Sequence, residues 1–223
     1  MSAAAYGLLQ ERDFAAAVLG GGQGKRLGMS KILLEIGGRT VLDHIIDCLR
    51  DVFPSILLVL KKGNQVPAMS ATPGVEVIPD ALPSNGPLVG IYTALQNSPA
   101  PYVFVMACDM PYPNMDLVRG MLREAAGREA VVPRMNGHLE PLFAVYRRDL
   151  LEKVRAFLDE DRLKIPDLIA ELDVRYFEKD EISSYDPDFR SFFNVNTLED
   201  LRSAQDMWGL MQKERPGAIA ARG

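Results

Sequence analysis

The chain has 223 residues, of which 48% are apolar and 25% are charged, so it holds enough apolar material to bury a full core. One compact domain is the simplest expectation for this length, and two small lobes remain an alternative. The chain has 25 Lys and Arg residues and 30 Asp and Glu residues, which gives a net charge of −5. This charge argues against a protein that binds long nucleic acid by neutralising phosphates.

The two cysteines and the apolar segments favour a cytoplasmic protein. Cys48 and Cys108 lie in apolar stretches without C-x-x-C spacing, which suggests neither a disulfide framework nor a zinc cluster. The longest unbroken apolar run, residues 102–108, is far shorter than the roughly 20 residues that cross a bilayer. Residues 1–13 lack the layout of a signal peptide, so we expect no membrane association.

In the first half, strands and helices alternate. Residues 14–19 are expected to form a buried strand that ends at a glycine loop, and residues 40–51 carry apolar side chains at helical spacing. Further strands are predicted at 56–60, 75–78 and 102–107, with a helix at 88–96 and another at 115–126. This alternation favours a Rossmann-like α/β fold with a mostly parallel central sheet flanked by helices.

The second half has a mixed pattern. Short strands are predicted at 130–133, 142–146, 174–177 and 192–195, and helices at 149–158 and 165–172. Thr197 is expected to open a last helix, with Glu199 and Asp200 in its first turn. We expect one domain over residues 14–212, with loose termini at 1–13 and 213–223.

The segment from Leu19 to Lys31 has the features of an anion-binding loop. Five glycines follow the first strand, at positions 20, 21, 22, 24 and 28, and they allow backbone N–H groups to approach phosphate oxygens. Lys25, Arg26 and Lys31 add positive charge at the carboxyl end of the strand, where α/β sheets bind ligands. The spacing fits neither the P-loop nor the dinucleotide-binding pattern. A flexible loop with solvated basic residues is the alternative.

Two aspartates follow strands that end at the same edge of the predicted sheet. Asp109 comes directly after the strand at 102–107 and Cys108, and Asp80 comes after the strand at 75–78. Mg²⁺ binds through one or two carboxylates together with substrate phosphate oxygens, so Asp109 is a candidate magnesium ligand. A turn aspartate before Pro111 is the alternative. Pro87 fits the first turn of the next helix, which Asn85 is expected to cap.

These motifs, taken in their order, resemble the molybdenum cofactor guanylyltransferase family of the MobA type, a nucleotidyltransferase group with a Rossmann-like fold. The resemblance rests on the glycine loop and on Gly-Pro-Leu-Val-Gly at 86–90, Cys-Asp-Met-Pro at 108–111, Glu-Pro-Leu-Phe-Ala-Val-Tyr at 140–146 and Phe-Asn-Val-Asn at 193–196. It implies transfer of GMP from Mg²⁺-GTP to the terminal phosphate of molybdopterin or of the molybdenum cofactor. Molybdoenzyme-maturation proteins are further candidate partners.

The resemblance also implies roles for individual residues. The nucleotide would be held by Leu19, Gly20, Gly21, Gly22 and Asp80. Its phosphates would be held by Arg26 and Lys31, and Mg²⁺ would be bound by Asp109. Lys31, Arg26 and Asp109 would form the catalytic group. Asn194 and Asn196 would bind the acceptor, since their amides both donate and accept hydrogen bonds. Considered alone, the two asparagines also fit strand-end and turn positions.

Three departures from the family pattern keep other functions open. Ser30 stands where an aspartate is usual, Lys62 lies near the position of a family asparagine, and Lys164 falls on an arginine position. Lysine does not reproduce the bidentate fork of arginine. The alternatives are a related transferase that uses CTP or another phosphorylated acceptor, and a non-catalytic protein that binds and delivers the cofactor.

Overall fold

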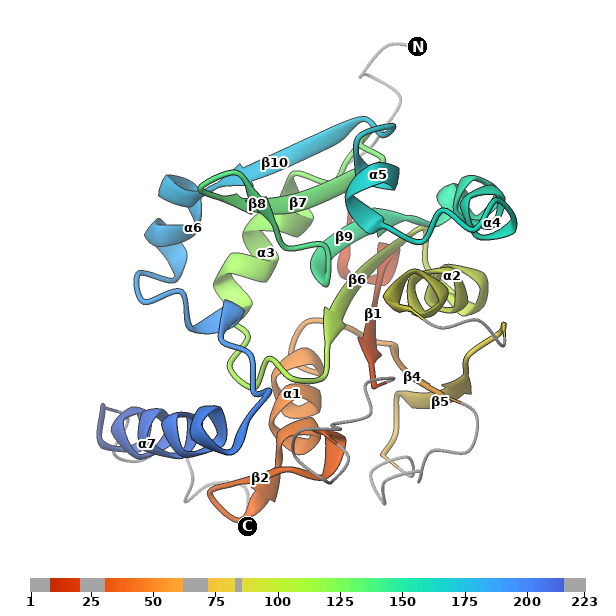
Figure 1. The fold of residues 1–223 in the computed structure, drawn as a ribbon. Helices are drawn as coiled ribbons and strands as arrows, with labels where there is room; N and C mark the ends of the chain where they lie inside the picture. Colours follow the sequence, from red (N-terminus) through yellow and green to blue (C-terminus); the bar gives the residue numbers. More distant parts are fainter. Residues whose placement is uncertain (1–8, 21–30, 62–71, 83–85, 215–223) are drawn as a thin grey trace.

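A computed structural model describes residues 9–20, 31–61, 72–82 and 86–214 of the chain. In this part, eight strands form one central sheet in the order β10-β7-β9-β6-β1-β4-β5, with β8 paired to β7 (Figure 1). The expected α/β fold with a mostly parallel central sheet is confirmed.

The strands differ in direction across the sheet. Those that run parallel are β1 (Phe14–Leu19), β4 (Ile56–Leu60), β5 (Val75–Pro79), β6 (Tyr102–Ala107), β7 (Ala130–Met135) and β10 (Val174–Glu178). β9 (Phe143–Arg147) is antiparallel between β6 and β7, and β8 (His138–Leu139) is antiparallel to β7. A separate hairpin joins β2 (Glu35–Ile36) and β3 (Arg39–Thr40).

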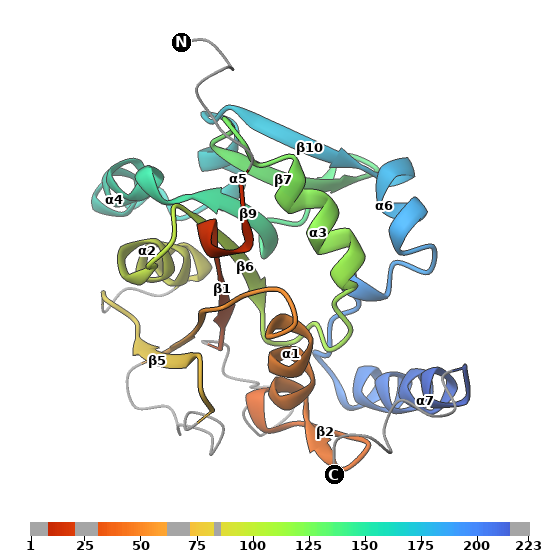
Figure 2. The same ribbon diagram turned by 180° about the vertical axis from the view of Figure 1, so that it is seen from behind.

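Helices cover both faces of the sheet (Figures 1 and 2). On one face lie α2 (Pro87–Asn97), α4 (Leu151–Asp159) and α5 (Ile165–Ile169). On the other lie α1 (Val41–Leu49), α3 (Met115–Arg123) and α6 (Lys179–Tyr185), with α7 (Leu198–Glu214) beside α1 and β2. Short 3-10 helices occupy Glu11–Asp13, Lys31–Leu33, Arg148–Leu150 and Arg190–Phe192.

The alternation of side chains along β1 divides the core into two layers. Ala16 and Val18 pack with the helices of one face, while Ala17 and Leu19 pack with those of the other, and all four are buried. A strand covered on both faces carries apolar residues without interruption, which is the pattern that identified β1 in the sequence.

Some predicted elements need correction. The strand expected at 192–195 is wrong, because Arg190–Phe192 forms a 3-10 helix and the Val195 N–H donates to the Asp109 carbonyl instead of joining a ladder. The helices expected at 115–126 and 165–172 end earlier, at Arg123 and Ile169. Gly86 takes the N-cap position of α2 in place of Asn85, which itself lies outside the described residues.

The sheet order creates a switch point beside β1. The chain moves from β1 to β4 and β5 on one side and then returns to place β6 on the other side. Leu19, at the end of β1, is level with Val59 of β4 and Ala107 of β6. Ligands of open α/β sheets bind at such points, outside the carboxyl ends of the strands.

Candidate active site

A cavity of about 280 Å³ opens at the carboxyl ends of the central strands. Its walls come from the ends of β1, β4 and β6, from the residues after β5 and from the first turn of α2. The lining residues are Leu19, Lys31, Val59, Lys61, Asp80, Gly86, Pro87, Gly90, Ala107, Cys108, Asp109 and Leu142. The cavity therefore lies at the topological switch point and combines cations, carboxylates and a helix N-terminus.

Lys31 and Asp109 form an ion pair in this cavity. Lys31 Nζ lies 2.7 Å from Asp109 Oδ2, and each side chain is 15% exposed. Lys31 Nζ also donates a hydrogen bond to Asn196 Oδ1 over 2.5 Å. The residue after the glycine loop, the end of β6 and the segment before α7 thus meet at one ammonium group.

Backbone hydrogen bonds hold the Asn196 segment in place. The Val195 N–H donates to the Asp109 carbonyl over 2.9 Å. The Asp200 carboxylate accepts from the backbone N–H groups of Asn196 and Thr197. Hydrogen bonds, above all the one from the Asn196 N–H, hold the pKa of Asp200 below its usual value. The N-terminus of α7 is therefore fixed beside Lys31.

One oxygen of Asp109 has no partner in the described part of the chain. Asp109 Oδ1 is buried and accepts no hydrogen bond there, while Oδ2 holds Lys31. A buried oxygen of this kind costs free energy unless a ligand satisfies it. A hard cation suits it, because Mg²⁺ is bound through one or two carboxylates and substrate phosphate oxygens. No cluster of three or more metal-ligating side chains occurs among the described residues, so Asp109 would act with the substrate.

Asp80 and Lys61 face the same cavity from β5 and β4. The Asp80 N–H donates to the Leu60 carbonyl over 2.8 Å, which places Asp80 at the end of the ladder between the two strands. Burial raises the pKa of the Asp80 carboxyl, and the charge of Lys61 opposes that shift. Asp80 lies in the same cavity as Leu19, Lys31 and Asp109, as expected, whereas Lys61 had not been predicted as a site residue.

Two glycines let backbone segments approach closely at the cavity wall. A Cβ on Gly20 would lie 2.4 Å from Leu60 Cδ2, and a Cβ on Gly90 would lie 2.9 Å from Leu19 Cδ1. The absence of a side chain at Gly90 brings the first turns of α2 against the end of β1. The N-terminus of α2 then borders the cavity, where helix N–H groups favour anions.

The remaining predicted residues have different outcomes. Gly21, Gly22 and Arg26 lie outside the described residues. Asn196 joins Lys31, but the Asn194 side chain donates to the Phe192 carbonyl over 3.0 Å. The two asparagines therefore have different surroundings, which their spacing alone did not indicate.

Cys108 lines the cavity but is a buried thiol. Burial, with a further contribution from the Asp109 charge, raises the pKa of Cys108 to about 12. A thiol with such a pKa is a poor nucleophile near neutral pH.

Leu142 lines the cavity on the side of β9, and its carbonyl accepts a hydrogen bond from the Ala107 N–H. Cys108 and Leu142 were both missed as site residues because apolar side chains at strand ends carry no distinctive sequence signal.

The fold and the site together define an α/β protein of the Rossmann-like class, with a cavity at the switch point whose lysines and helix N-terminus suit an anionic ligand. Comparison with known proteins refines this class. The family model described as the MobA-like NTP transferase domain matches residues 16–175, and the chain belongs to that family of nucleotidyltransferases. The resemblance noted in the sequence is thereby confirmed.

Individual relatives support the same family. A protein of Methanosarcina acetivorans, named a probable molybdenum cofactor guanylyltransferase, is 37% identical over 199 residues, which cover 85% of this chain and 88% of that protein. The solved structure of molybdopterin-guanine dinucleotide biosynthesis protein A from Archaeoglobus fulgidus has a TM-score of 0.78 and 27% identity, covering 88% of this chain and 100% of its own.

A more distant neighbour shows the fold alone. The 2-C-methyl-D-erythritol 4-phosphate cytidylyltransferase from Thermus thermophilus has a TM-score of 0.63 at 18% identity, covering 86% of this chain and 97% of its own. Among the described helices, none is both long and apolar enough to span a membrane.

Proposed function

We propose that this protein transfers GMP from GTP to the terminal phosphate of molybdopterin or of the molybdenum cofactor, and releases pyrophosphate. Membership of the MobA-like family and the name of the relative that is 37% identical support this activity. The observation that carries the proposal is the pairing of Lys31 with Asp109, whose second carboxylate oxygen is buried without a partner in the described structure.

The reaction joins two anions. An oxygen of the acceptor phosphate forms a bond to the α-phosphorus of GTP, the bond from that phosphorus to the bridging oxygen breaks, and pyrophosphate leaves with the electron pair. A phosphate nucleophile is already ionised near pH 7, so the chain needs no general base. This agrees with the raised pKa of Cys108, a thiol in the cavity lining that stays protonated near neutral pH.

The main task of the site is therefore to offset negative charge and to align the reactants. Lys31 contributes an ammonium group at the end of the glycine loop, and Arg26 is proposed to contribute a second cation. Leu19 and Gly20 to Gly22 are proposed to present the loop backbone to the nucleotide, and Asp80, which lines the same cavity as Leu19, is proposed to contact the nucleotide as well. Asn194 and Asn196 remain our candidates for acceptor binding.

Asp109 fits a divalent cation, and we propose that it holds Mg²⁺ through Oδ1. When bound, Mg²⁺ would neutralise charge on the nucleotide phosphates. The ammonium group of Lys31 neutralises Asp109 in the structure described here. It would turn toward phosphate oxygens when the nucleotide enters, since lysine is a mobile point charge on a flexible stem.

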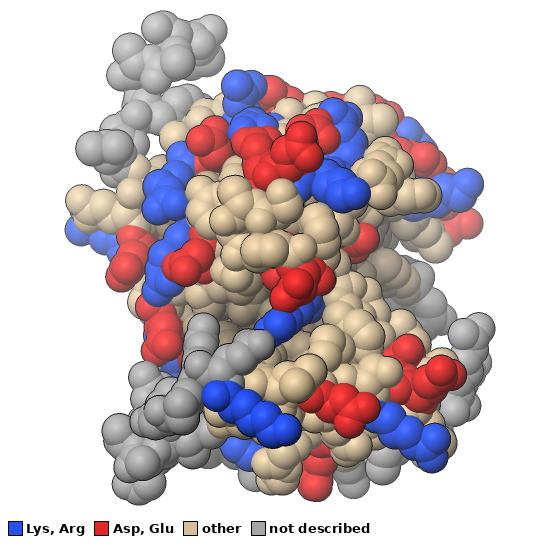
Figure 3. Space-filling model, turned by 90° about the vertical axis from the view of Figure 1, so that its left-hand side faces the viewer, with Lys and Arg blue, Asp and Glu red and all other residues tan. Residues whose placement is uncertain are grey.

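We further propose that residues 14–212 act as one catalytic domain in the cytoplasm, with molybdoenzyme-maturation proteins as partners. Small-molecule substrates suit the surface better than long nucleic acid. On the face shown in Figure 3, acidic and basic side chains are interspersed and do not form a broad basic patch.

The decisive experiment measures pyrophosphate release by the purified protein with Mg²⁺, molybdopterin and either GTP or CTP. The proposal expects release with GTP and little with CTP. Release with CTP alone would indicate a cytidylyl transferase, and release only with another phosphorylated acceptor would change the substrate. A folded protein that binds molybdopterin tightly and releases no pyrophosphate would instead be a cofactor-delivery protein.

A further inference from the structure

A second group of polar side chains lies at the same carboxyl edge of the sheet as the cavity, at the ends of β7 and β10. The strand register connects the two places. Leu142 accepts a hydrogen bond from Ala107 and lines the cavity. Arg134, near the end of β7, is level with Leu139 of β8, which lies three residues before Leu142 in the chain. In the sheet, β7 is two strands from β6, or about 10 Å along the hydrogen-bonding direction, and Arg134 and Ala107 lie near the carboxyl ends of these two strands.

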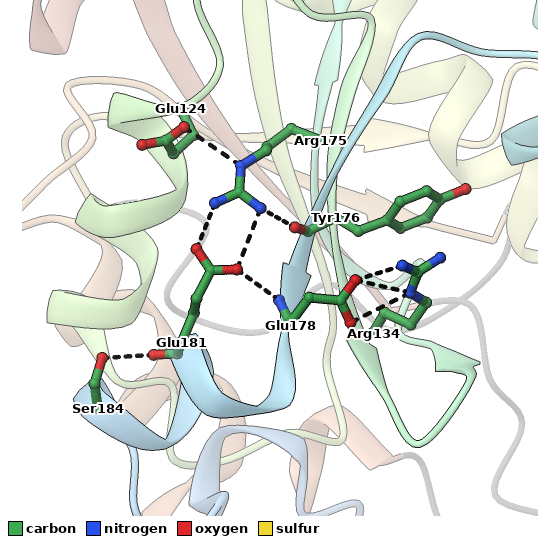
Figure 4. Close-up of polar contacts among 7 residues, drawn as sticks. All are labelled: Glu124, Arg134, Arg175, Tyr176, Glu178, Glu181 and Ser184. Carbon is green, nitrogen blue, oxygen red and sulfur yellow. Dashed lines mark hydrogen bonds and ion pairs between the residues drawn. The ribbon is translucent and has the colours of Figure 1, made fainter.

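At this place Arg134 is held between an aromatic ring and a carboxylate (Figure 4). Its guanidinium carbon lies 4.0 Å from the centroid of the Tyr176 ring. Its Nε donates to Glu178 Oε1 and Oε2 over 3.1 and 3.3 Å, and its Nη2 also donates to Oε1. These hydrogen bonds use one edge of the guanidinium. Within the described structure they leave both N–H groups of Nη1 available to a ligand.

The neighbouring side chains make this arrangement rigid. The Glu178 N–H donates to Glu181 Oε2 over 3.0 Å, so Glu178 begins α6 in a fixed position. Arg175, which points to the opposite face of β10, binds Glu181, Glu124 and the Tyr176 carbonyl (Figure 4). β10 is thereby tied to α3 and α6. Binding groups held by such a supporting layer keep their geometry when a ligand arrives.

The group is also accessible. The side chain of Arg134 is 38% exposed and that of Glu178 is 48% exposed. Alternation places Arg134, Tyr176 and Glu178 on the face of the sheet that carries α2, α4 and α5, which is the face with Leu142. In Figure 1 these helices lie toward the ends where β7 and β10 begin and do not extend over the carboxyl ends of these two strands.

We propose that Arg134, supported by Tyr176 and Glu178, binds the heterocyclic end of the acceptor and thereby helps to select it. This inference rests on the proposed function. If the phosphate of the acceptor lies at Asp109 and the rest of the molecule extends along the sheet edge, a pyrimidinone ring about 10 Å away would reach Arg134. The Nη1 N–H groups donate to its carbonyl oxygen and ring nitrogen, because arginine is a donor in a fixed planar geometry.

If the pair of Arg134 and Glu178 only joined the two strands, replacing Arg134 would have the same effect as replacing the arginine of another such pair. The chain contains a pair for this comparison. At the other end of the same two strands, Arg128 Nη1 lies 2.9 Å from Asp173 Oδ1, with exposed fractions of 47% and 56%. Both pairs join β7 to β10 at the surface. Of these two arginines, Arg134 is the one at the carboxyl edge, so Arg128→Ala is the matched control.

The test measures steady-state kinetics of pyrophosphate release with each substrate varied in turn. For Arg134→Ala we expect the KM for molybdopterin to rise about tenfold or more, because a hydrogen bond from a charged group is lost. The KM for GTP should change by less than about twofold. Arg134→Lys should recover only part of this loss because lysine lacks the planar fork. Arg128→Ala should leave both KM values unchanged.

The two hypotheses fail in different ways. A wild-type protein that releases no pyrophosphate from GTP with molybdopterin overturns the proposed function and this inference with it. A wild-type protein that is active, with an unchanged molybdopterin KM in Arg134→Ala, overturns the inference alone. Equal changes in Arg134→Ala and Arg128→Ala would show a structural pair and would also overturn it.

Discussion

Lys31 and Asp109, which are 78 positions apart in the chain, meet through a 2.7 Å contact between Nζ and Oδ2. The contact joins the end of the glycine loop to the end of β6, and it leaves Asp109 Oδ1 buried without a partner in the described structure. A single carboxylate thus has one oxygen assigned to the protein and one suited to a ligand. The role of the free oxygen can be tested at Asp109, and the orientation of Lys31 can be tested at Asn196.

The first prediction concerns Asp109. In Asp109→Asn, the amide is a weaker ligand for a divalent cation and carries no charge, so pyrophosphate release should fall by about 100-fold or more. The fold should persist, since the side chain keeps its shape and its oxygen can still accept from Lys31. Activity is measured over a range of Mg²⁺ concentrations, and thermal unfolding is the control. A folded variant with wild-type activity and Mg²⁺ dependence would remove Asp109 from the site.

The second prediction separates the two asparagines. Asn196→Ala removes the hydrogen bond to Lys31 Nζ, so the lysine loses its orientation and kcat should fall about tenfold. Asn194→Ala removes only a contact to the Phe192 carbonyl and should leave kcat near the wild-type value. If Asn194 binds the acceptor, its loss should appear in the molybdopterin KM instead. Equal effects of the two variants on kcat would contradict the distinct surroundings seen in the structure.

The central part of the fold and site was predictable because its signals are local. The apolar runs of β1, β4 and β6 occur where the sequence analysis placed them, since strands buried on both faces carry no polar interruption. Their ends then indicate the position of the cavity, because parallel strands share one carboxyl edge. Asp80 and Asp109 were predicted in this way, as residues that follow strands, and both line the cavity.

Other features depend on long-range contacts that a single sequence does not specify. Residues 192–195 are apolar enough for a strand, yet the Val195 N–H binds the Asp109 carbonyl, which is 86 positions away. α6 was missed although Glu178 and Glu181 form a capping box at its start, because its seven residues show too little helical periodicity. The position of Arg134 beside Glu178 follows only from the pairing of β7 with β10.

The third prediction concerns the pH dependence at Asp80. Burial raises the pKa of this carboxyl in the folded state, so the folded protein binds the proton more tightly than the unfolded chain. The free energy of unfolding therefore falls as the pH rises through the window between the ordinary pKa of aspartate and the raised one. Asp80→Asn removes the titration and should be more stable than wild type at pH 7, by less than about 1 kcal/mol because the side chain is partly solvated.

The advantage of Asp80→Asn should disappear below the ordinary pKa of aspartate, where the wild-type carboxyl is neutral in both states. Urea unfolding at several pH values measures the difference. The matched control is Asp206→Asn in α7, at an exposed position where a surface substitution should change stability little at any pH. An Asp80→Asn variant that is less stable at pH 7 would show that the charge of Lys61 outweighs burial.

The last prediction tests the close approach of α2 to β1. Replacing glycine by alanine inside a helix normally stabilises it by about 1 kcal/mol. At Gly90, however, the new Cβ would lie 2.9 Å from Leu19 Cδ1, and overpacking of a buried contact costs about 1–3 kcal/mol. Gly90→Ala should therefore lower the melting temperature. Gly209→Ala in α7, where nothing lies within 4 Å of the new Cβ, should raise it.

The same substitution should affect the site, because Leu19 lines the cavity. A Leu19 side chain displaced by the new methyl group would narrow the space next to the nucleotide phosphates, so the KM for GTP should rise in Gly90→Ala but not in Gly209→Ala. Thermal unfolding and GTP kinetics on both variants measure these effects. A Gly90→Ala protein with higher stability and an unchanged KM for GTP would show that Leu19 moves aside at no cost, and that the narrow contact does not shape the cavity.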